Sequence, residues 1–130
     1  MEKKLVVLVD TNILIQIGNK DKNTVEFVKD LEMKNHLSIS IVTEMEMLVG
    51  CRNKIELHNL DRFLKRFFVY KITDPISDLA KELIKKYYLS HGLKIPDALI
   101  ASTALKLDIP LLTINKKDFQ FINGIKLLNS

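Results

Sequence analysis

The stretch Leu5-Val6-Val7-Leu8-Val9-Asp10-Thr11-Asn12 decides the fold of this chain. Its first five residues form a short apolar run rich in β-branched side chains, which predicts a strand buried on both faces. Strands of this kind occur in parallel sheets that helices cover. Asp10 then places a carboxylate where the strand should leave the sheet, and burying a carboxylate without a partner is costly. We therefore interpret Asp10 as a functional residue rather than as the start of a simple turn.

The rest of the chain alternates between helical and strand-like patterns. Apolar residues at three- and four-residue spacings predict helices over residues 24–34, 57–67 and 76–87. Strands are expected where β-rich runs occur, at residues 37–42, 68–72, 111–114 and 125–128. The expected order is strand, helix, strand, helix, helix, strand, helix, helix, strand, helix, strand. Parallel strands need crossover helices, so this order predicts an α/β sandwich with a mainly parallel sheet.

Capping residues mark the ends of the predicted helices. Asp74-Pro75 should begin the third helix named above, and Gly92 should end it. Thr43 is expected to cap a helix that carries Glu46 as in a capping box and stops at Gly50. Pro96 is expected at the first position of a helix over residues 97–107.

Length and composition indicate the broad class of protein. The 130 residues, 47% hydrophobic and 28% charged, suit a single domain over residues 1–130. The apolar runs are too short for a membrane span, and no secretory signal pattern is evident, so we expect a cytoplasmic protein. One cysteine, Cys51, excludes an intramolecular disulfide and a multi-thiolate zinc site. The net charge of +4 mildly favours polyanionic partners.

Four acids lie near predicted element boundaries: Asp10, Glu46, Asp97 and Asp118. In open parallel sheets, ligands bind outside the carboxyl ends of the strands, where we expect these acids to meet. Carboxylates brought together repel one another unless a cation neutralises them, and oxygen-only ligands suit Mg²⁺ or Mn²⁺. Such ions activate water for phosphate hydrolysis. Local alternatives exist, because Glu46 fits a capping box, Asp97 gains from the helix dipole, and Asp118 could start a helix.

Four motifs together resemble the PIN-domain nuclease family, and most closely its VapC-like toxin branch. The first is Asp10-Thr11-Asn12, and the second runs from Ser40 to Gly50. In the second motif the acid stands three residues after the threonine and four before the glycine, which selects Glu46 over Glu44. The third is Asp97-Ala98-Leu99-Ile100-Ala101 and the fourth is Thr113-Ile114-Asn115-Lys116-Lys117-Asp118-Phe119. The ordered set covers nearly the whole chain.

The resemblance implies a PIN-like three-layer α/β/α sandwich that cleaves RNA phosphodiesters with Mg²⁺ or Mn²⁺. Asp10, Glu46 and Asp97 would be the core catalytic and metal-binding residues, and a fourth acid would assist them. Some members have aspartate where this chain has Asn115, so the fourth role falls to Asp118, to Asn115 through a neutral contact, or to both through water. Asn12 and Thr113 would orient carboxylates or water by hydrogen bonding.

The toxin branch also implies partners: an RNA substrate, a cognate antitoxin that occupies the acidic cleft, and a second copy in a homodimer. A housekeeping RNA-processing nuclease of the same family is the nearest alternative. A catalytically silent RNA- or partner-binding domain is a second, and the intact acidic set argues against it. An aspartyl-phosphate domain is a third; Asn12, standing two residues after Asp10, argues against its phosphatase form.

Other residue types carry weaker signals. Several basic residues could hold RNA phosphates, although most are expected on ordinary solvated helix faces. They are Arg52, Lys54, Lys65, Arg66, Lys85 and Lys86. The histidines His36, His58 and His91 form no ligand pattern and are interpreted as structural or surface residues. Tyr87-Tyr88 could stack on bases, but Tyr87 fits the apolar stripe of its helix.

Overall fold

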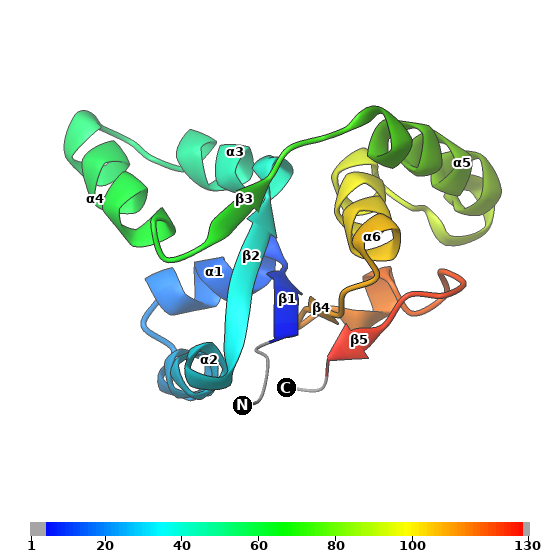
Figure 1. Cartoon of the computed structure of the whole chain (residues 1–130). Coiled ribbons are helices and arrows are strands. Elements are labelled where there is room, and N and C mark those ends of the chain that lie inside the picture. Colours follow the sequence, from blue (N-terminus) through cyan, green and yellow to red (C-terminus); the bar gives the residue numbers. More distant parts are fainter. Residues whose placement is uncertain (1–4, 129–130) are drawn as a thin grey trace.

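Five parallel strands form one sheet at the centre of the computed structural model, which describes residues 5–128 (Figure 1). The strands are β1 (Leu5–Val9), β2 (Asn35–Ser40), β3 (Phe68–Tyr70), β4 (Leu111–Leu112) and β5 (Leu127–Leu128). They stand side by side in the order β3-β2-β1-β4-β5, and every neighbouring pair is parallel. The predicted α/β architecture with a mainly parallel sheet is therefore confirmed.

Six α-helices and one short 3₁₀ turn connect the strands within the described residues. They are α1 (Thr11–Gly18), α2 (Lys22–Lys34), α3 (Ile41–Val49), α4 (Lys54–Leu64), α5 (Asp74–His91), α6 (Ile95–Leu107) and η1 (Lys116–Asp118). The predicted ends of α5 are confirmed: Pro75 lies in its first turn, and Gly92 follows its last residue with φ +67°, a conformation that glycine adopts without strain.

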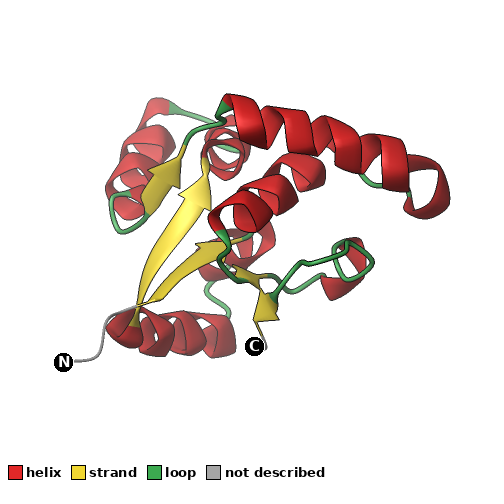
Figure 2. Ribbon diagram, turned by 45° about the vertical axis from the view of Figure 1, so that its right-hand side comes forward, coloured by secondary structure: helices red, strands yellow, loops and turns green. Residues whose placement is uncertain are grey.

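The alternation of side chains along β1 divides the core into two layers. Val7 and Val9 pack on one face of the sheet against side chains of α1, α2 and α4. Leu8, fully buried, packs on the other face against α5 and α6. Helices thus cover both faces of the twisted sheet (Figures 1 and 2). Truncating Leu8 to alanine would remove about 2–5 kcal/mol of stability, because a cavity would replace its contacts.

The helix α1 was not predicted from the sequence. Its residues, Thr11 to Gly18, include three isoleucines, whose β-branched side chains have a modest intrinsic helix propensity. Tertiary packing overrides that propensity, because Ile13 and Leu14 are buried in the core shared with α2. The Asp10 side chain caps the helix by accepting from the Thr11 backbone N–H.

Two further predictions about helix boundaries were wrong. Ser40, not Thr43, is the N-cap of α3, and its side chain accepts from the Val42 backbone N–H at 3.1 Å. The strand β2 consequently ends at Ser40, two residues earlier than expected. The last expected helix is only the 3₁₀ turn η1.

The strand order reverses between β1 and β4. From β1 the chain proceeds outward through β2 to β3, and then returns to the other side of β1 to form β4 and β5. In open parallel sheets this switch point is where the loops after two neighbouring strands diverge and leave a crevice at the carboxyl edge. Asp10 follows β1 and Thr113 follows β4, so both lie at this point. Among residues 5–128, no helix is long and apolar enough to span a bilayer.

Candidate active site

The first two parts of the site meet at the switch point. Thr113 Oγ1 donates to Asp10 Oδ2 at 2.9 Å, and both side chains are buried. The Asn12 side chain donates to Thr113 Oγ1 at 3.2 Å and accepts from the Ile114 backbone N–H at 3.3 Å. Asn12 and Thr113 therefore fix the position of the Asp10 carboxylate and of the loop after β4. The role of Asn12 and Thr113 in catalysis stays a prediction.

Glu46 reaches the same edge from α3. Thr11 Oγ1 lies 2.7 Å from Glu46 Oε1 and 3.0 Å from Thr43 Oγ1. The backbone N–H of Thr11 donates to Asp10 Oδ1 at 2.8 Å. Thr11 thus contacts two of the predicted acids through two different groups, and it links the start of α1 to α3.

Asp97 enters the site from the first turn of α6, which follows another helix rather than a strand. The pKa of the Asp97 carboxyl is raised from 3.8 to about 6, first by burial and then by the charges of Asp10, Asp118 and Glu46. The nearby Lys94 ammonium opposes this effect and lowers the pKa. The structure therefore places all four predicted acids within electrostatic range of one another, although they come from four separate segments.

The pKa of Asp10 is shifted in the same direction as that of Asp97. Burial raises the pKa of its carboxyl, the hydrogen bonds from Thr113 and Thr11 lower it, and the charges of Glu46 and Asp118 raise it again. Asp118 and Asn115 are both candidates for the fourth predicted position, and they act in different ways. Asp118 acts on Asp10 through its charge, whereas Asn115 contributes a backbone N–H that donates to Thr113 Oγ1 at 3.1 Å.

The four carboxylates offer the oxygen donors that a hard divalent cation prefers. Their donor set is oxygen only, and no ion pair formed within residues 5–128 includes any of them. A cation would relieve the repulsion that raises the Asp97 pKa. Among residues 5–128, no three His, Cys, Asp or Glu side chains are grouped closely enough to hold a metal ion by themselves.

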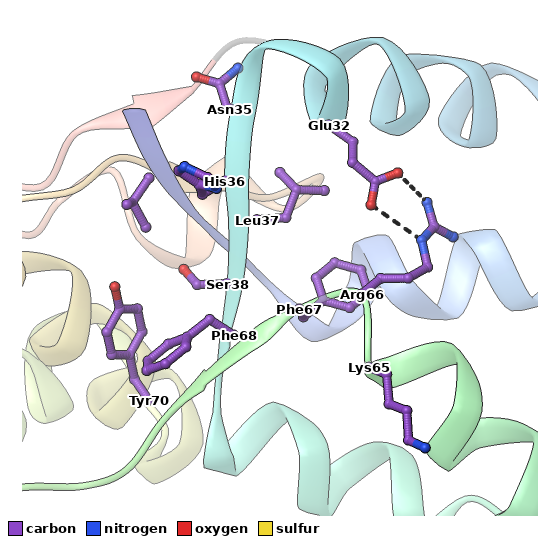
Figure 3. Close-up of a pocket in the computed structure, with 11 residues that line it drawn as sticks. Glu32, Asn35, His36, Leu37, Ser38, Lys65, Arg66, Phe67, Phe68 and Tyr70 are labelled. Atoms are coloured by element: carbon purple, nitrogen blue, oxygen red, sulfur yellow. Dashed lines mark hydrogen bonds and ion pairs between the residues drawn. The ribbon is translucent and has the colours of Figure 1, made fainter. Parts of the chain in front are cut away.

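Two of the predicted basic candidates have other partners. Arg52 pairs with Glu56 at 2.9 Å, and Arg66 pairs with Glu32 at 2.7 Å. The Arg66 pair borders a pocket of about 700 Å³ beside the amino-terminal half of β2 (Figure 3). Glu32 and Arg66 precede β2 and β3, so they lie at the edge of the sheet opposite the acids. None of the four acids lines this pocket, so we do not assign the chemistry to it.

The structure also reveals site residues that were not proposed from the sequence. Thr11 was quoted only as part of a motif, and Thr43 was interpreted as a helix cap. Both are buried, and their hydroxyls face one another beside Glu46. Lys94 stands three residues before Asp97 and is exposed. Thr43 and Glu46 are about one helical turn apart in the sequence, and this spacing predicts that they share one face of the helix.

The remaining aromatic and histidine predictions concern residues outside the acidic edge. Tyr87 is buried and packs against Phe121 with ring centroids 5.2 Å apart, while Tyr88 is exposed. His91 stacks on Phe121 at 4.2 Å, and His36 and His58 are exposed. The interpretation of these histidines as structural or surface residues agrees with their positions.

The fold and the four acids define a PIN domain. The sequence profile of this domain matches residues 7–123, so the chain belongs to the PIN domain family.

Known relatives place the chain near one branch of the family. It is 29% identical to ribonuclease VapC10 of Mycobacterium tuberculosis over 122 residues, which cover 93% of this chain and 91% of that protein. It is 31% identical to ribonuclease VapC1 of Methanocaldococcus jannaschii over 129 residues, covering 93% and 85% respectively. The predicted resemblance to VapC-like PIN proteins is therefore confirmed.

Solved structures agree with this placement. The chain is similar to one in the VapBC2 structure from Rickettsia felis bound to a promoter DNA fragment, with a TM-score of 0.81, 26% identity, and coverage of 97% of this chain and 99% of that one. A chain of a toxin-antitoxin complex from Klebsiella pneumoniae gives a TM-score of 0.77 and 29% identity, with coverage of 92% and 94%. These likenesses confirm the PIN-like α/β/α fold.

Proposed function

We propose that this protein is a metal-dependent endoribonuclease and the toxin of a VapBC-type toxin-antitoxin pair. The observation that carries the proposal is the gathering of acids at the switch of the sheet, where Thr11 bonds both Asp10 and Glu46 and where the charges of Asp10, Asp118 and Glu46 act on the partly buried Asp97. Family membership and the VapC relatives support RNA as the substrate.

Asp10, Glu46 and Asp97 would hold the cation, and Asp118 would assist from the loop after β4. A bound Mg²⁺ or Mn²⁺ would supply activated water and would stabilise the charge that develops on the phosphate. The chain's own residues perform the positioning: Thr113 and Asn12 orient Asp10, and Thr11 orients Glu46. Positioning of this kind keeps the carboxylate oxygens directed at the cation rather than at solvent.

The same comparisons support a protein partner. The solved relatives include toxin-antitoxin complexes, so we propose a cognate antitoxin for this chain. Such a partner would cover the acidic edge and block access to RNA. We also propose a homodimer, which sedimentation of the purified protein with and without the antitoxin would test.

The decisive experiment is cleavage of a panel of structured RNAs by purified protein with Mg²⁺ or Mn²⁺, beside an identically purified Asp97→Asn variant. Metal-dependent cleavage that the variant lacks would support the proposal. Equal cleavage by both samples would contradict the assigned site. Growth arrest on expression, relieved by a neighbouring antitoxin gene, would distinguish a toxin from a housekeeping RNA-processing nuclease.

A further inference from the structure

Two buried threonine hydroxyls lie behind Glu46. Thr43, in the first turn of α3, is 0% exposed, and Thr11, the first residue of α1, is 8% exposed. Glu46 itself is exposed at the surface of α3. Thr11 Oγ1 lies between the other two side chains, 3.0 Å from Thr43 Oγ1 and 2.7 Å from Glu46 Oε1. The three groups therefore form a chain of oxygens that runs from the core to the acidic edge.

The direction of the hydrogen bonds follows from the number of protons that these three groups can donate. An ionised carboxylate can only accept, so Thr11 must donate its single hydroxyl proton to Glu46. The Thr11 oxygen is then free to accept, and Thr43 must be the donor if the contact at 3.0 Å is a hydrogen bond. Hydrogen bonds in such a chain polarise one another in a buried site, which strengthens the terminal bond to the carboxylate.

The consequence for Glu46 is geometric. A glutamate on an exposed helix face samples many rotamers, and ordering it costs conformational entropy. Here one carboxylate oxygen, Oε1, is anchored by Thr11, so the carboxylate is held close to Asp10, whose Oδ1 accepts from the Thr11 backbone N–H. Loss of the Thr43 donor would remove one of the two contacts that orient the Thr11 hydroxyl, and it would weaken the bond from Thr11 to Glu46.

We propose that Thr43 is a positioning residue for the metal site: its hydroxyl donates to Thr11 and thereby commits the Thr11 proton to Glu46. This inference rests on the proposed function, because it assumes that Glu46 binds the cation. Thr43 would contact neither the metal nor RNA, and it would act on Glu46 only through Thr11.

The test measures Mn²⁺ affinity by calorimetry in protein freed of metal, for the wild type and three variants. Thr43→Val keeps the volume and removes the donor, and Thr43→Ser restores the donor. Thr103→Val is the matched control, since Thr103 is also a buried helical threonine but donates to the Leu99 carbonyl in α6. Residues that orient metal ligands change metal affinity by about 10–100-fold, so Thr43→Val should weaken Mn²⁺ binding by at least about tenfold.

Two further readouts separate positioning from general damage. At saturating Mn²⁺, Thr43→Val should recover most of its RNA cleavage rate, with an unchanged KM for RNA. In a Glu46→Gln background, Thr43→Val should have no additional effect on Mn²⁺ affinity, because the group it positions is already altered. Should Thr43→Val fail to fold by circular dichroism, Thr43→Ala replaces it in the same scheme.

The outcomes are distinct. Wild-type Mn²⁺ affinity in a folded Thr43→Val variant would overturn the positioning role while leaving the proposed function intact. An equal loss of affinity in Thr103→Val or in the Glu46→Gln background would also overturn it. Mn²⁺ binding that depends on Thr43, in a wild-type protein that cleaves no RNA, would support the positioning role and contradict the proposed nuclease. Absence of Mn²⁺ binding by the wild type would overturn both.

Discussion

The Thr113 hydroxyl donates to Asp10 Oδ2 across 2.9 Å and joins the ends of β4 and β1, two segments 103 residues apart in sequence. This bond links the two loops at the switch point of the sheet and holds a buried carboxylate in one orientation. Burial raises the pKa of the Asp10 carboxyl, and the bond from Thr113 is one of the two hydrogen bonds that lower it.

Thr113→Val is therefore expected to destabilise the protein and to impair cleavage. A buried hydrogen bond to a charged group contributes about 1.5–3 kcal/mol, so the free energy of unfolding near neutral pH should fall by about that amount. The loss should shrink in acid, because the variant's Asp10 is then protonated and needs no donor. Urea titrations of the metal-free protein at two pH values check this. Thr113→Ser should resemble the wild type, and identical stability of Thr113→Val and wild type would contradict the role.

Asp97→Asn should stabilise the metal-free protein at high pH. The pKa of Asp97 is about 6 in the folded state and 3.8 in the unfolded state, so the folded state binds more protons between these pH values. Ionised Asp97 therefore lowers the free energy of unfolding, and this loss is complete only above pH 6. Relative to Asp97→Asn, the wild type should lose about 1–2 kcal/mol between about pH 4 and pH 8, once the value is reduced for partial solvent screening. Unfolding midpoints in chelator measure it. Asp30→Asn, on an exposed part of α2, is the control and should show no such difference.

Asp118→Asn and Asn115→Ala should separate the two candidates for the fourth position. Removing the Asp118 charge should lower the pKa of Asp97, because that charge helps to raise it. Asn115→Ala should leave the Asp97 pKa unchanged, since a neutral side chain is removed. Carboxyl chemical shifts of Asp97, followed by NMR titration of metal-free protein, report the pKa directly. We expect a loss of RNA cleavage of about tenfold or more for Asp118→Asn only. The reverse ranking would assign the fourth role to Asn115.

Lys94→Ala should weaken RNA binding. Lys94 is exposed at the start of α6, and its ammonium acts electrostatically on Asp97, so it lies where phosphates must approach the acids. Measured in the Asp97→Asn background, which prevents cleavage, the dissociation constant for RNA should rise about threefold to tenfold at low salt, with a shallower salt dependence. Lys106→Ala, at the other end of α6, is the matched control and should bind as the parent does. Equal losses in both variants would indicate only a general charge effect.

Arg66→Ala should leave RNA cleavage unchanged, although Arg66 was one of the basic candidates for phosphate contact. Its guanidinium is engaged by Glu32 at 2.7 Å and lies 5.3 Å from the Phe63 ring centroid, at the sheet edge away from the acids. The pair is partly exposed, so the variant should lose only about 1 kcal/mol of stability. Cleavage rates and thermal unfolding of the same preparation check both statements. A clear loss of cleavage in a folded variant would place RNA on this side of the molecule.

The sequence by itself determined the strand β1, the ends of α5 and the parallel arrangement of the sheet. These features depend on local patterns: an apolar β-branched run, a proline and a glycine at helix ends, and helical spacing between strands. It also identified Asp10, Glu46, Asp97 and Asp118 as acids near element boundaries. The order of the four motifs was sufficient to indicate the family.

Only the tertiary structure decided how those acids are held and which neighbours serve them. The helix α1 forms against local propensity, because Ile13 and Leu14 gain burial there. The Thr43 hydroxyl points to Thr11, 32 residues away, rather than capping its own helix. Such contacts depend on which segments the strand order brings together at the switch point. Local sequence patterns do not predict that order. The sequence contains the chemical groups, and the packing of distant segments gives them their geometry.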